Sequence, residues 1–216
     1  MNTLETWNYF ATPVYAVDLP QFLSPVDAVA KAAIDRAKSG KKIDKIHPMW
    51  MSDNFFEDSS IKDFSLYVLN AAWDILDSQG YNLTNHKTYY LEMWCQEHHK
   101  TSGMEEHIHG FGSHISGFYF LNNPANSSRA IIYDPRPVKK YASLPEKDTN
   151  QGTYASQMFN FEPKPGQLLL MNSWLAHSFS RHGSDTPLRF VHFNIIARYV
   201  EPAPVPITGP GCAVII

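Results

Sequence analysis

The chain has 216 residues, of which 13% are aromatic and 18% are charged, and its formal net charge at pH 7 is −3. This length and composition predict one ordered globular domain and exclude a chain that is disordered throughout. The charge gives no sign of the clustered basic face that nucleic-acid binding requires, so we expect no nucleic-acid partner.

Signals for export or membrane insertion are not visible in the sequence. The amino terminus has no basic segment followed by an apolar core, and the apolar runs fall far short of the roughly 20 residues that span a bilayer. Two cysteines, Cys95 and Cys212, are too few for a disulfide scaffold. We therefore expect a cytoplasmic protein with no membrane partner. The sequence leaves open whether the protein forms a homodimer.

The first third of the chain shows two helical patterns. In SPVDAVAKAAIDRAKSG (24–40), Ser24 can cap the helix and Pro25 suits its first turn, and apolar residues then recur at helical spacing. In SSIKDFSLYVLNAAWDILDSQG (59–80), Ser59 or Ser60 can cap and a glycine ends the pattern. Both helices are amphipathic, so we expect them to pack on one face of a sheet.

From residue 87 onward the hydrophobic period changes to two. Five β-branched or aromatic segments, separated by turn residues, predict an antiparallel sandwich or jelly roll; they are 87–96, 114–121, 129–134, 166–172 and 189–199. We expect a single domain over 1–216, with a mostly helical part (1–86), a jelly-roll core (87–200) and an extended tail (201–216). Residues 146–152 are polar without periodicity and predict a mobile loop.

Two histidines, His107 and His109, stand one residue apart just before the strand segment 114–121. Side chains at i and i+2 of an extended segment point the same way, so these imidazoles are expected to aim at one point. Imidazole is a common ligand of iron, zinc, nickel and copper, and His177, after the segment 166–172, offers a third ligand. The alternative is a solvated pair at a strand edge.

Arg189 opens the last strand segment and shares one face with apolar residues. A buried guanidinium needs an anionic partner, which a carboxylate-bearing ligand would supply through two parallel N–H···O bonds. The alternative is an arginine that extends its charged end to solvent at the strand end.

Four segments of the chain together resemble a known family: HIHGFGSHISGFYFL (107–121), YDPRP (133–137), KPGQLLLMNSWLAHSFS (164–180) and LRFVHFNI (188–195). Their order is similar to that of the 2-oxoglutarate and Fe(II)-dependent dioxygenases, in the branch related to prolyl 4-hydroxylases. The resemblance implies a mainly β fold with flanking α, namely a double-stranded β-helix (jelly roll, cupin-like) with the two amino-terminal helices packed on one sheet.

The resemblance also implies roles for individual residues. His107 and His177 would ligate iron, His109 would take the position usually held by an aspartate, and Arg189 would anchor the distal carboxylate of 2-oxoglutarate. Tyr119 and Tyr90 are further candidates for contact with the cosubstrate. The sequence departs from the wider pattern because the triad contains no carboxylate, and because phenylalanine stands at 120 where a tyrosine is frequent.

The implied activity is a hydroxylase that couples O2-driven decarboxylation of 2-oxoglutarate to oxidation of an amino acid, a peptide or a small molecule. One alternative is a three-histidine, cupin-like metal dioxygenase that does not use 2-oxoglutarate, in which Arg189 has no defined task. Another is a non-catalytic jelly-roll module that binds or assembles with a partner.

The remaining polar candidates have two interpretations each. His98 and His99 are expected in a solvated loop, while His114 and His192 are expected as hydrogen-bonded core or edge residues, with His192 on the strand face opposite Arg189. Two further residues, Asp134 and Arg136, either position a substrate from a pocket rim or form a local ion pair that shapes a proline-rich turn.

Overall fold

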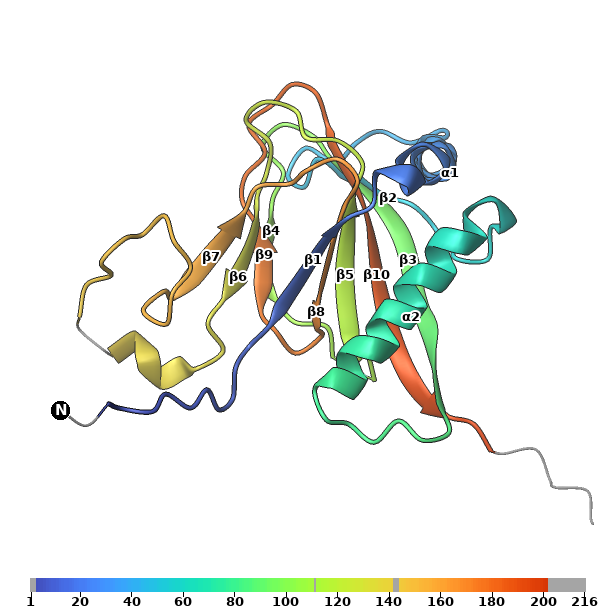
Figure 1. Cartoon of the computed structure of the whole chain (residues 1–216). Helices are drawn as coiled ribbons and strands as arrows, with labels where there is room; N and C mark the ends of the chain where they lie inside the picture. Colours follow the sequence, from blue (N-terminus) through green and yellow to red (C-terminus); the bar gives the residue numbers. More distant parts are fainter. Residues whose placement is uncertain (1–2, 111, 142–143, 202–216) are drawn as a thin grey trace, which may run out of the picture.

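Two antiparallel sheets face each other, and two helices cover the outer face of the larger sheet (Figure 1). The computed structural model describes residues 3–110, 112–141 and 144–201. The larger sheet has six strands in the order β1-β8-β5-β10-β3-β2, and the smaller has four in the order β4-β9-β6-β7. The chain is therefore mainly β with two flanking helices, as the sequence predicts.

The larger sheet consists of β1 (Val14–Asp18), β8 (Gln167–Asn172), β5 (Ile115–Phe120), β10 (Leu188–Tyr199), β3 (His86–His98) and β2 (Met49–Met51). The smaller sheet consists of β4 (Met104–His107), β9 (His177–Phe179), β6 (Ala130–Tyr133) and β7 (Met158–Phe161). The helices are α1 (Leu23–Lys38) and α2 (Lys62–Ser78), and single 3-10 turns are η1 (Pro20–Phe22), η2 (Ser59–Ile61) and η3 (Pro137–Tyr141). The two predicted helices and the five predicted strand segments correspond to α1, α2, β3, β5, β6, β8 and β10.

Both helices begin differently from the prediction. The chain enters α1 directly from η1, so Ser24 lies inside the helix and makes no capping bond. Before α2, the carboxylate of Asp58 accepts a hydrogen bond from the backbone N–H of Ser60 and caps η2. An aspartate therefore has the capping role that was expected of a serine.

The larger sheet is buried on both faces. Its outer face packs on the helices, where Tyr119 of β5 and Phe193 of β10 join one apolar cluster. Its inner face packs on the smaller sheet, where Phe118 and Phe190 join a second cluster. Because strand residues alternate, neighbouring residues of β5 and β10 enter different cores. Hydrophobicity alone therefore does not tell which face of these strands is the inner one.

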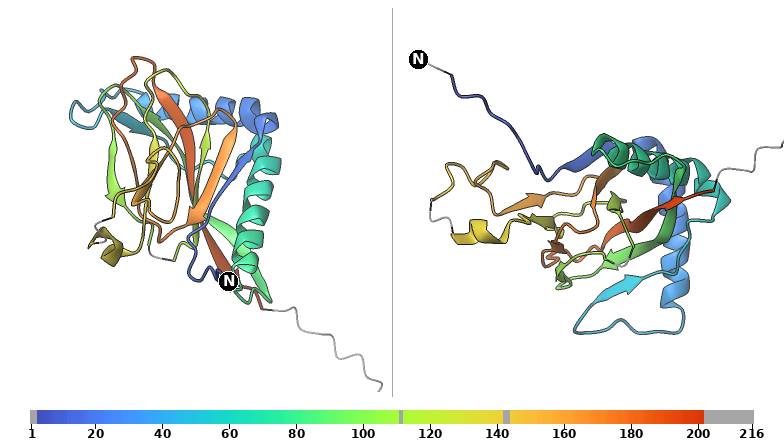
Figure 2. Two further views of the ribbon diagram at one scale, coloured as in Figure 1. Left: turned by 60° about the vertical axis from the view of Figure 1, so that its left-hand side comes forward. Right: turned by 90° about the horizontal axis from the view of Figure 1, so that it is seen from below.

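The first 86 residues are not only helical, because they also contribute β1 and β2 to the larger sheet. Residues 146–152 contain no helix or strand, and the predicted tail from residue 202 onward lies outside the described residues. The segment with η3 projects from the sandwich on the side away from α1 (Figure 2). Neither long helix within the described ranges has the length and apolarity that a membrane-spanning segment needs.

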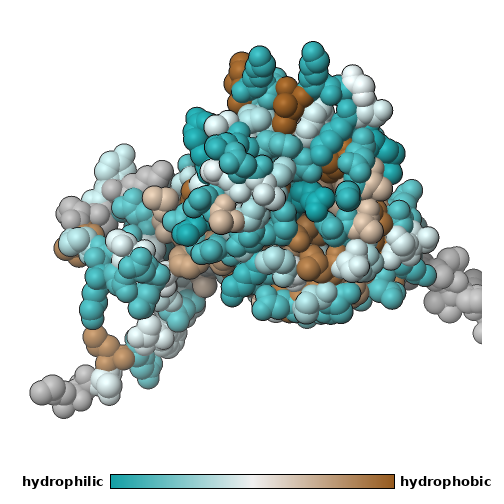
Figure 3. Space-filling model, turned by 90° about the horizontal axis from the view of Figure 1, so that it is seen from above, coloured by the Kyte–Doolittle hydropathy of each residue, from teal (hydrophilic) through white to brown (hydrophobic). Residues whose placement is uncertain are grey.

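The face seen from above in Figure 3 is mainly hydrophilic, and its hydrophobic residues are scattered over the surface. Singly exposed apolar side chains are normal on soluble domains and need no partner. This face therefore gives no indication of a docking patch.

Candidate metal centre

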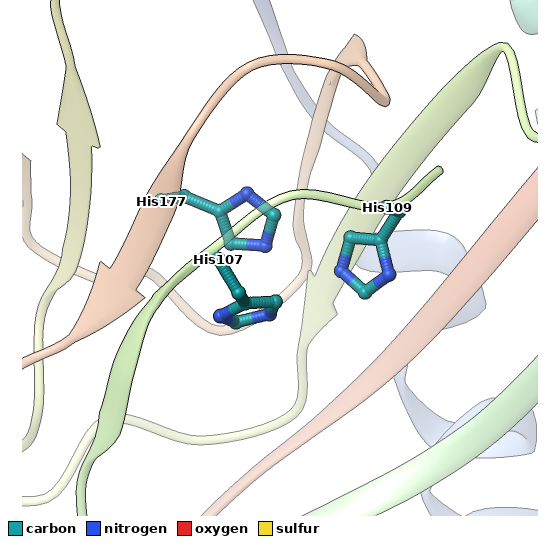
Figure 4. Close-up of side chains that lie close together, drawn as sticks. All are labelled: His107, His109 and His177. Atoms are coloured by element: carbon teal, nitrogen blue, oxygen red, sulfur yellow. The ribbon is translucent and has the colours of Figure 1, made fainter. Parts of the chain in front are cut away.

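Three imidazoles converge between the two sheets, those of His107, His109 and His177 (Figure 4). One nitrogen of each ring lies within 4.8 Å of the corresponding nitrogens of the other two. The ring centroids are 4.5 to 5.1 Å apart. Ligands about 2.0–2.2 Å from one ion are separated from one another by no more than roughly twice that distance, so the three nitrogens can share a metal.

Strand pairing brings the triad together. His107 ends β4 and lies opposite His177, the first residue of β9, in the antiparallel register. Just beyond β4, the backbone N–H of His109 donates to the carbonyl of Ser173, 2.8 Å away, in the turn between β8 and β9. Two backbone pairings therefore bind the H-x-H segment to the segment that carries the third histidine.

Backbone carbonyls determine which nitrogen of two of these rings carries the proton. Nδ1 of His107 lies 2.7 Å from the carbonyl oxygen of Glu105, and Nδ1 of His177 lies 3.0 Å from that of Leu175. A carbonyl only accepts, so each Nδ1 carries the hydrogen and each Nε2 presents its lone pair. Such a carbonyl contact is the usual partner of a metal-bound histidine.

Two of the Nε2 atoms have nothing else to bind. Nε2 of His109 and Nε2 of His177 are buried and have no hydrogen-bond partner among the described residues. A buried polar atom without a partner costs about 1–3 kcal/mol, which a bound metal would remove. The donor set, three neutral nitrogens, suits a divalent transition metal such as Fe(II), so the residues present fit the metal that the family resemblance implies.

Burial keeps two of these imidazoles, those of His109 and His177, neutral. Burial lowers the pKa of His177 to about 3 and that of His109 to about 4, and the nearby His107 lowers both further. Only a deprotonated imidazole nitrogen binds a metal, so both rings are ready to ligate at neutral pH.

Asn194 of β10 lies against the outer edge of His109. Its side-chain nitrogen is 3.3 Å from Nδ1 of His109 and 3.0 Å from a carboxylate oxygen of Glu92, to which it donates. Its side-chain oxygen accepts a hydrogen bond from the hydroxyl of Ser116 at 2.7 Å. This chain of contacts fixes the orientation of the histidine that replaces the usual aspartate.

A fourth histidine, His192 of β10, borders the triad and was not predicted as a site residue. It is 1% exposed, its ring centroid is 4.6 Å from that of His109, and neither ring nitrogen has a hydrogen-bond partner. The backbone of Gly117 is nearby but outside hydrogen-bonding geometry. Burial holds the pKa of His192 well below its usual value. Its place opposite Arg189 was predicted correctly, and the three converging histidines lie on the face of His192.

The three expected cosubstrate contacts do not reach the triad. A guanidinium nitrogen of Arg189 lies 3.1 Å from a carboxylate oxygen of Asp27 in α1, on the helix side of the sheet. The hydroxyl of Tyr119 donates to the carbonyl of Leu19 at 2.8 Å, and the hydroxyl of Tyr90 also donates to a backbone carbonyl of the helical layer, at 3.0 Å. Their expected place in the pocket is therefore wrong, because the strand face that carries them packs on the helices.

Two further histidines differ from expectation. His98 is buried and not solvated: its Nε2 lies 3.1 Å from the side-chain oxygen of Gln96, and its ring packs on Phe179 and Phe190. His99 is partly buried, and its Nε2 lies 2.7 Å from a carboxylate oxygen. Neither belongs to the group of three that could hold a metal.

A cleft of about 620 Å³ opens between the segment before β1 and strands β6 and β7, and none of the three histidines is among its lining residues. Ile132, which faces His177 in the β6–β9 register, and Leu175 form its inner end. Asp134 and Arg136 line the rim, where their side chains make an ion pair of 2.8 Å. Arg136 holds the pKa of Asp134 well below its usual value. Both interpretations of this pair thus agree with the structure, since it shapes a turn and borders a cleft.

Residues 92–194 match the model of a protein family described as "Putative 2OG-Fe(II) oxygenase". This segment contains the whole triad. The match covers just under half of the chain. The matched family depends on Fe(II) and 2-oxoglutarate. A comparison of the chain with curated proteins finds no match.

Solved structures of the same fold include a prolyl-4-hydroxylase from Pseudomonas putida, with 13% identity, a TM-score of 0.55 and coverage of 85% of this chain and 92% of that one. Another is the epimerase SnoN in complex with Fe3+, alpha ketoglutarate and nogalamycin RO. Its sequence identity is 12% and its TM-score is 0.56, and the match covers 93% of this chain and 88% of that one. A third is HygX from Streptomyces hygroscopicus with nickel and 2-oxoglutarate bound. Its sequence identity is 13% and its TM-score is 0.51, and the match covers 85% of this chain and 82% of that one. At these identities the likeness of this chain to them concerns the fold alone.

Proposed function

We propose that the protein is an Fe(II)- and 2-oxoglutarate-dependent oxygenase on a double-stranded β-helix, with iron held by His107, His109 and His177. The observation that carries the proposal is the convergence of three neutral imidazoles, two of whose inward nitrogens are buried without a partner. Iron and 2-oxoglutarate supply the oxidising chemistry when bound, and the protein supplies binding, orientation and exclusion of water.

The described residues divide this work. His107, His109 and His177 would hold the metal, which would supply the site where a 2-oxo acid and O2 bind. Phe118, whose ring centroid is 5.4 Å from that of His177, contributes an apolar wall on the inner side. The cleft that ends at Ile132 and Leu175 offers room for the organic substrate. Its volume lies within the usual range for sites that bind small molecules, and its open rim also admits one side chain of a peptide.

The lining of the cleft indicates the chemical class of the substrate. Aromatic and aliphatic residues predominate, and the Asp134–Arg136 pair is the polar feature at the rim. We therefore propose hydroxylation of an apolar part of an amino acid, a peptide or a small molecule. The homologous fold supports hydroxylation in one relative and epimerisation in another, so the fold alone does not select the outcome.

The test is anaerobic loading of the purified protein with Fe(II), followed by measurement of iron content, O2 uptake and succinate. We expect one iron per chain and succinate formation that requires 2-oxoglutarate, with slow uncoupled turnover even before a substrate is known. His177→Ala should lose both iron and succinate formation. Iron bound equally well by the variant would contradict the assignment of the centre.

A second candidate is a three-histidine dioxygenase that oxidises its substrate without a 2-oxo acid. The observation in its favour is that Arg189 pairs with Asp27 on the helix side of the sheet. The guanidinium is therefore not on the inner face, where it would have to lie to bind the distal carboxylate of 2-oxoglutarate. The same assay separates the two functions. O2 uptake that depends on an organic substrate and never yields succinate would support the second candidate.

A further inference from the structure

The inner face of β10 has no cationic side chain beside the metal centre. Its inward residues are Leu188, Phe190, His192 and Asn194. Leu188 and Phe190 belong to the apolar core between the sheets and are fully buried. Arg189 projects from the other face into contact with Asp27. A carboxylate that entered the space beside the triad would therefore meet, from this strand, hydrocarbon, the imidazole of His192 and the amide of Asn194, but no cation.

That imidazole belongs to His192, which has an unusual environment. Its ring lies between the indole of Trp94 and the phenyl ring of Phe118, with centroid distances of 4.4 and 4.9 Å, and next to the triad member His109. Although it is 1% exposed, it makes no hydrogen bond with any described residue. Buried polar groups normally have partners, and exceptions in native proteins tend to indicate an absent water, ion or ligand.

The side chains around His192 indicate where that partner lies. Phe118 lies on one side of the ring and Trp94 on another, and the indole Nε1 of Trp94 is also buried without a hydrogen-bond partner among the described residues. The triad lies on a third side, where the open positions of the metal would be filled by ligand oxygens. A neutral imidazole can donate one hydrogen bond to such an oxygen and accept another.

On the basis of the proposed function, we infer that His192 is the inner contact of the metal-bound cosubstrate and replaces an arginine–carboxylate pair. The pocket should then recognise the 2-oxo acid group and an uncharged tail, since nothing cationic on β10 would select a second carboxylate. The cosubstrate class is accordingly 2-oxo acids in general, including monoanionic acids with an aliphatic tail, and not 2-oxoglutarate alone.

Calorimetric titration of the protein loaded with Ni(II), which keeps it from turning over, tests this inference. The probes are 2-oxoglutarate and 4-methyl-2-oxopentanoate, which share the chelating group and differ in the tail. We expect the branched acid to bind no more weakly than 2-oxoglutarate. A preference for 2-oxoglutarate of about threefold or more would overturn the inference, because a charge-assisted bidentate pair produces such a preference.

Three variants identify the residue responsible. His192→Phe, which keeps the ring volume, should weaken both acids roughly tenfold through the lost hydrogen bond. His192→Gln, which keeps an N–H donor, should recover part of the affinity, and both variants should retain full nickel content because His192 is not a ligand. Arg189→Met, which keeps the aliphatic stem at the helix, is the matched control and should change neither affinity.

The outcomes also separate this inference from the proposed function. Selective loss of 2-oxoglutarate binding in Arg189→Met would restore the arginine as the anchor and overturn the role of His192, while the oxygenase activity would stand. Unchanged affinities in His192→Phe would overturn it as well. If neither acid binds the metal-loaded protein, the inference and the 2-oxo acid part of the proposed function fail together.

Discussion

In the proposed centre, His109 would be a neutral ligand at a position where a carboxylate is usual. With three imidazole ligands, Fe(II) would keep a net charge of about +2, whereas one carboxylate would leave about +1. The extra positive charge should strengthen the attraction for an anionic 2-oxo acid at the metal itself. This attraction can offset in part the missing cation on the inner face of β10.

Substitutions of the triad should have unequal effects. His107→Ala and His177→Ala should abolish iron binding, because each removes one of two ligands that are paired across β4 and β9. His109→Asp should keep iron and partial turnover, since a carboxylate is an ordinary ligand at this position of a facial triad. The measurements are iron content and succinate formation for each variant. Full iron content and turnover in His109→Ala would show that His109 is not a ligand.

The triad could be predicted from the sequence, but the cosubstrate contacts could not. The spacing of His107 and His109 predicts that they share a direction, and the family resemblance pointed to His177 as the third member. The pairing of β4 with β9 brings them together. The face of Arg189 was assigned by its apolar neighbours, on the assumption that the apolar face surrounds the metal. That signal fails here because both faces of β10 are buried, one by helices and one by the second sheet.

At the scale of elements, the centre of β5 depends on close packing at Gly117. A Cβ at this position would lie 2.5 Å from a ring carbon of Phe193 and 2.6 Å from the carbonyl oxygen of Leu169. Gly117→Ala should therefore lower the free energy of unfolding by about 3 kcal/mol or more, because neither a strand backbone nor a packed ring can retreat. Gly110→Ala, where a Cβ would meet nothing within 4 Å, is the matched control. Urea unfolding curves compare the two; equal midpoints would contradict the packing argument.

The contact between α1 and β10 is expected to contribute to stability and not to catalysis. Arg189 and Asp27 are partly exposed, with side-chain exposures of 21% and 35%, so solvent screens their attraction. A double-mutant cycle of Asp27→Asn and Arg189→Met should give a coupling energy of about 0.5–1 kcal/mol. Thermal unfolding and iron content of the four proteins measure it. A loss of iron in either single variant would mean that the pair acts on the metal centre.

The strands that the sequence did not reveal are those that depend on their partners. The strands β2 and β9 have three residues each, β4 and β7 have four and β1 has five, so an alternating pattern in them is weak. They are strands because neighbouring backbones pair with them, as β9 does with both β4 and β6. The long segments carry their own pattern and were predicted closely: the boundaries of β10, with twelve residues, were correct within one residue, and those of β3 within two.

At the scale of the whole molecule, buried neutral imidazoles make the fold sensitive to acid. Burial lowers the pKa of His98 to about 3 and that of His109 to about 4, whereas in the unfolded chain each returns to its ordinary value near 6.5. As the pH falls below 6.5, these histidines bind protons in the unfolded state but stay unprotonated in the folded state. The free energy of unfolding therefore decreases from pH 6.5 downward, and it levels off only below the folded pKa values.

His98 allows this effect to be measured away from the metal, because it packs on Phe179 and Phe190 in the inner core. His98→Phe should cost about 1 kcal/mol at pH 7 through the lost contact with Gln96. Between about pH 6 and pH 4, however, the variant should lose stability less steeply, by about 1.4 kcal/mol per pH unit, because one proton fewer is taken up on unfolding. Urea unfolding of the metal-free protein at pH 7, 6 and 5 should thus give curves that converge and cross. Phe179→Leu disturbs the same packing without removing a titratable group, so it should lower stability equally at each pH. Parallel curves for His98→Phe and the unmodified protein would show that His98 is not the buried neutral group that this structure describes.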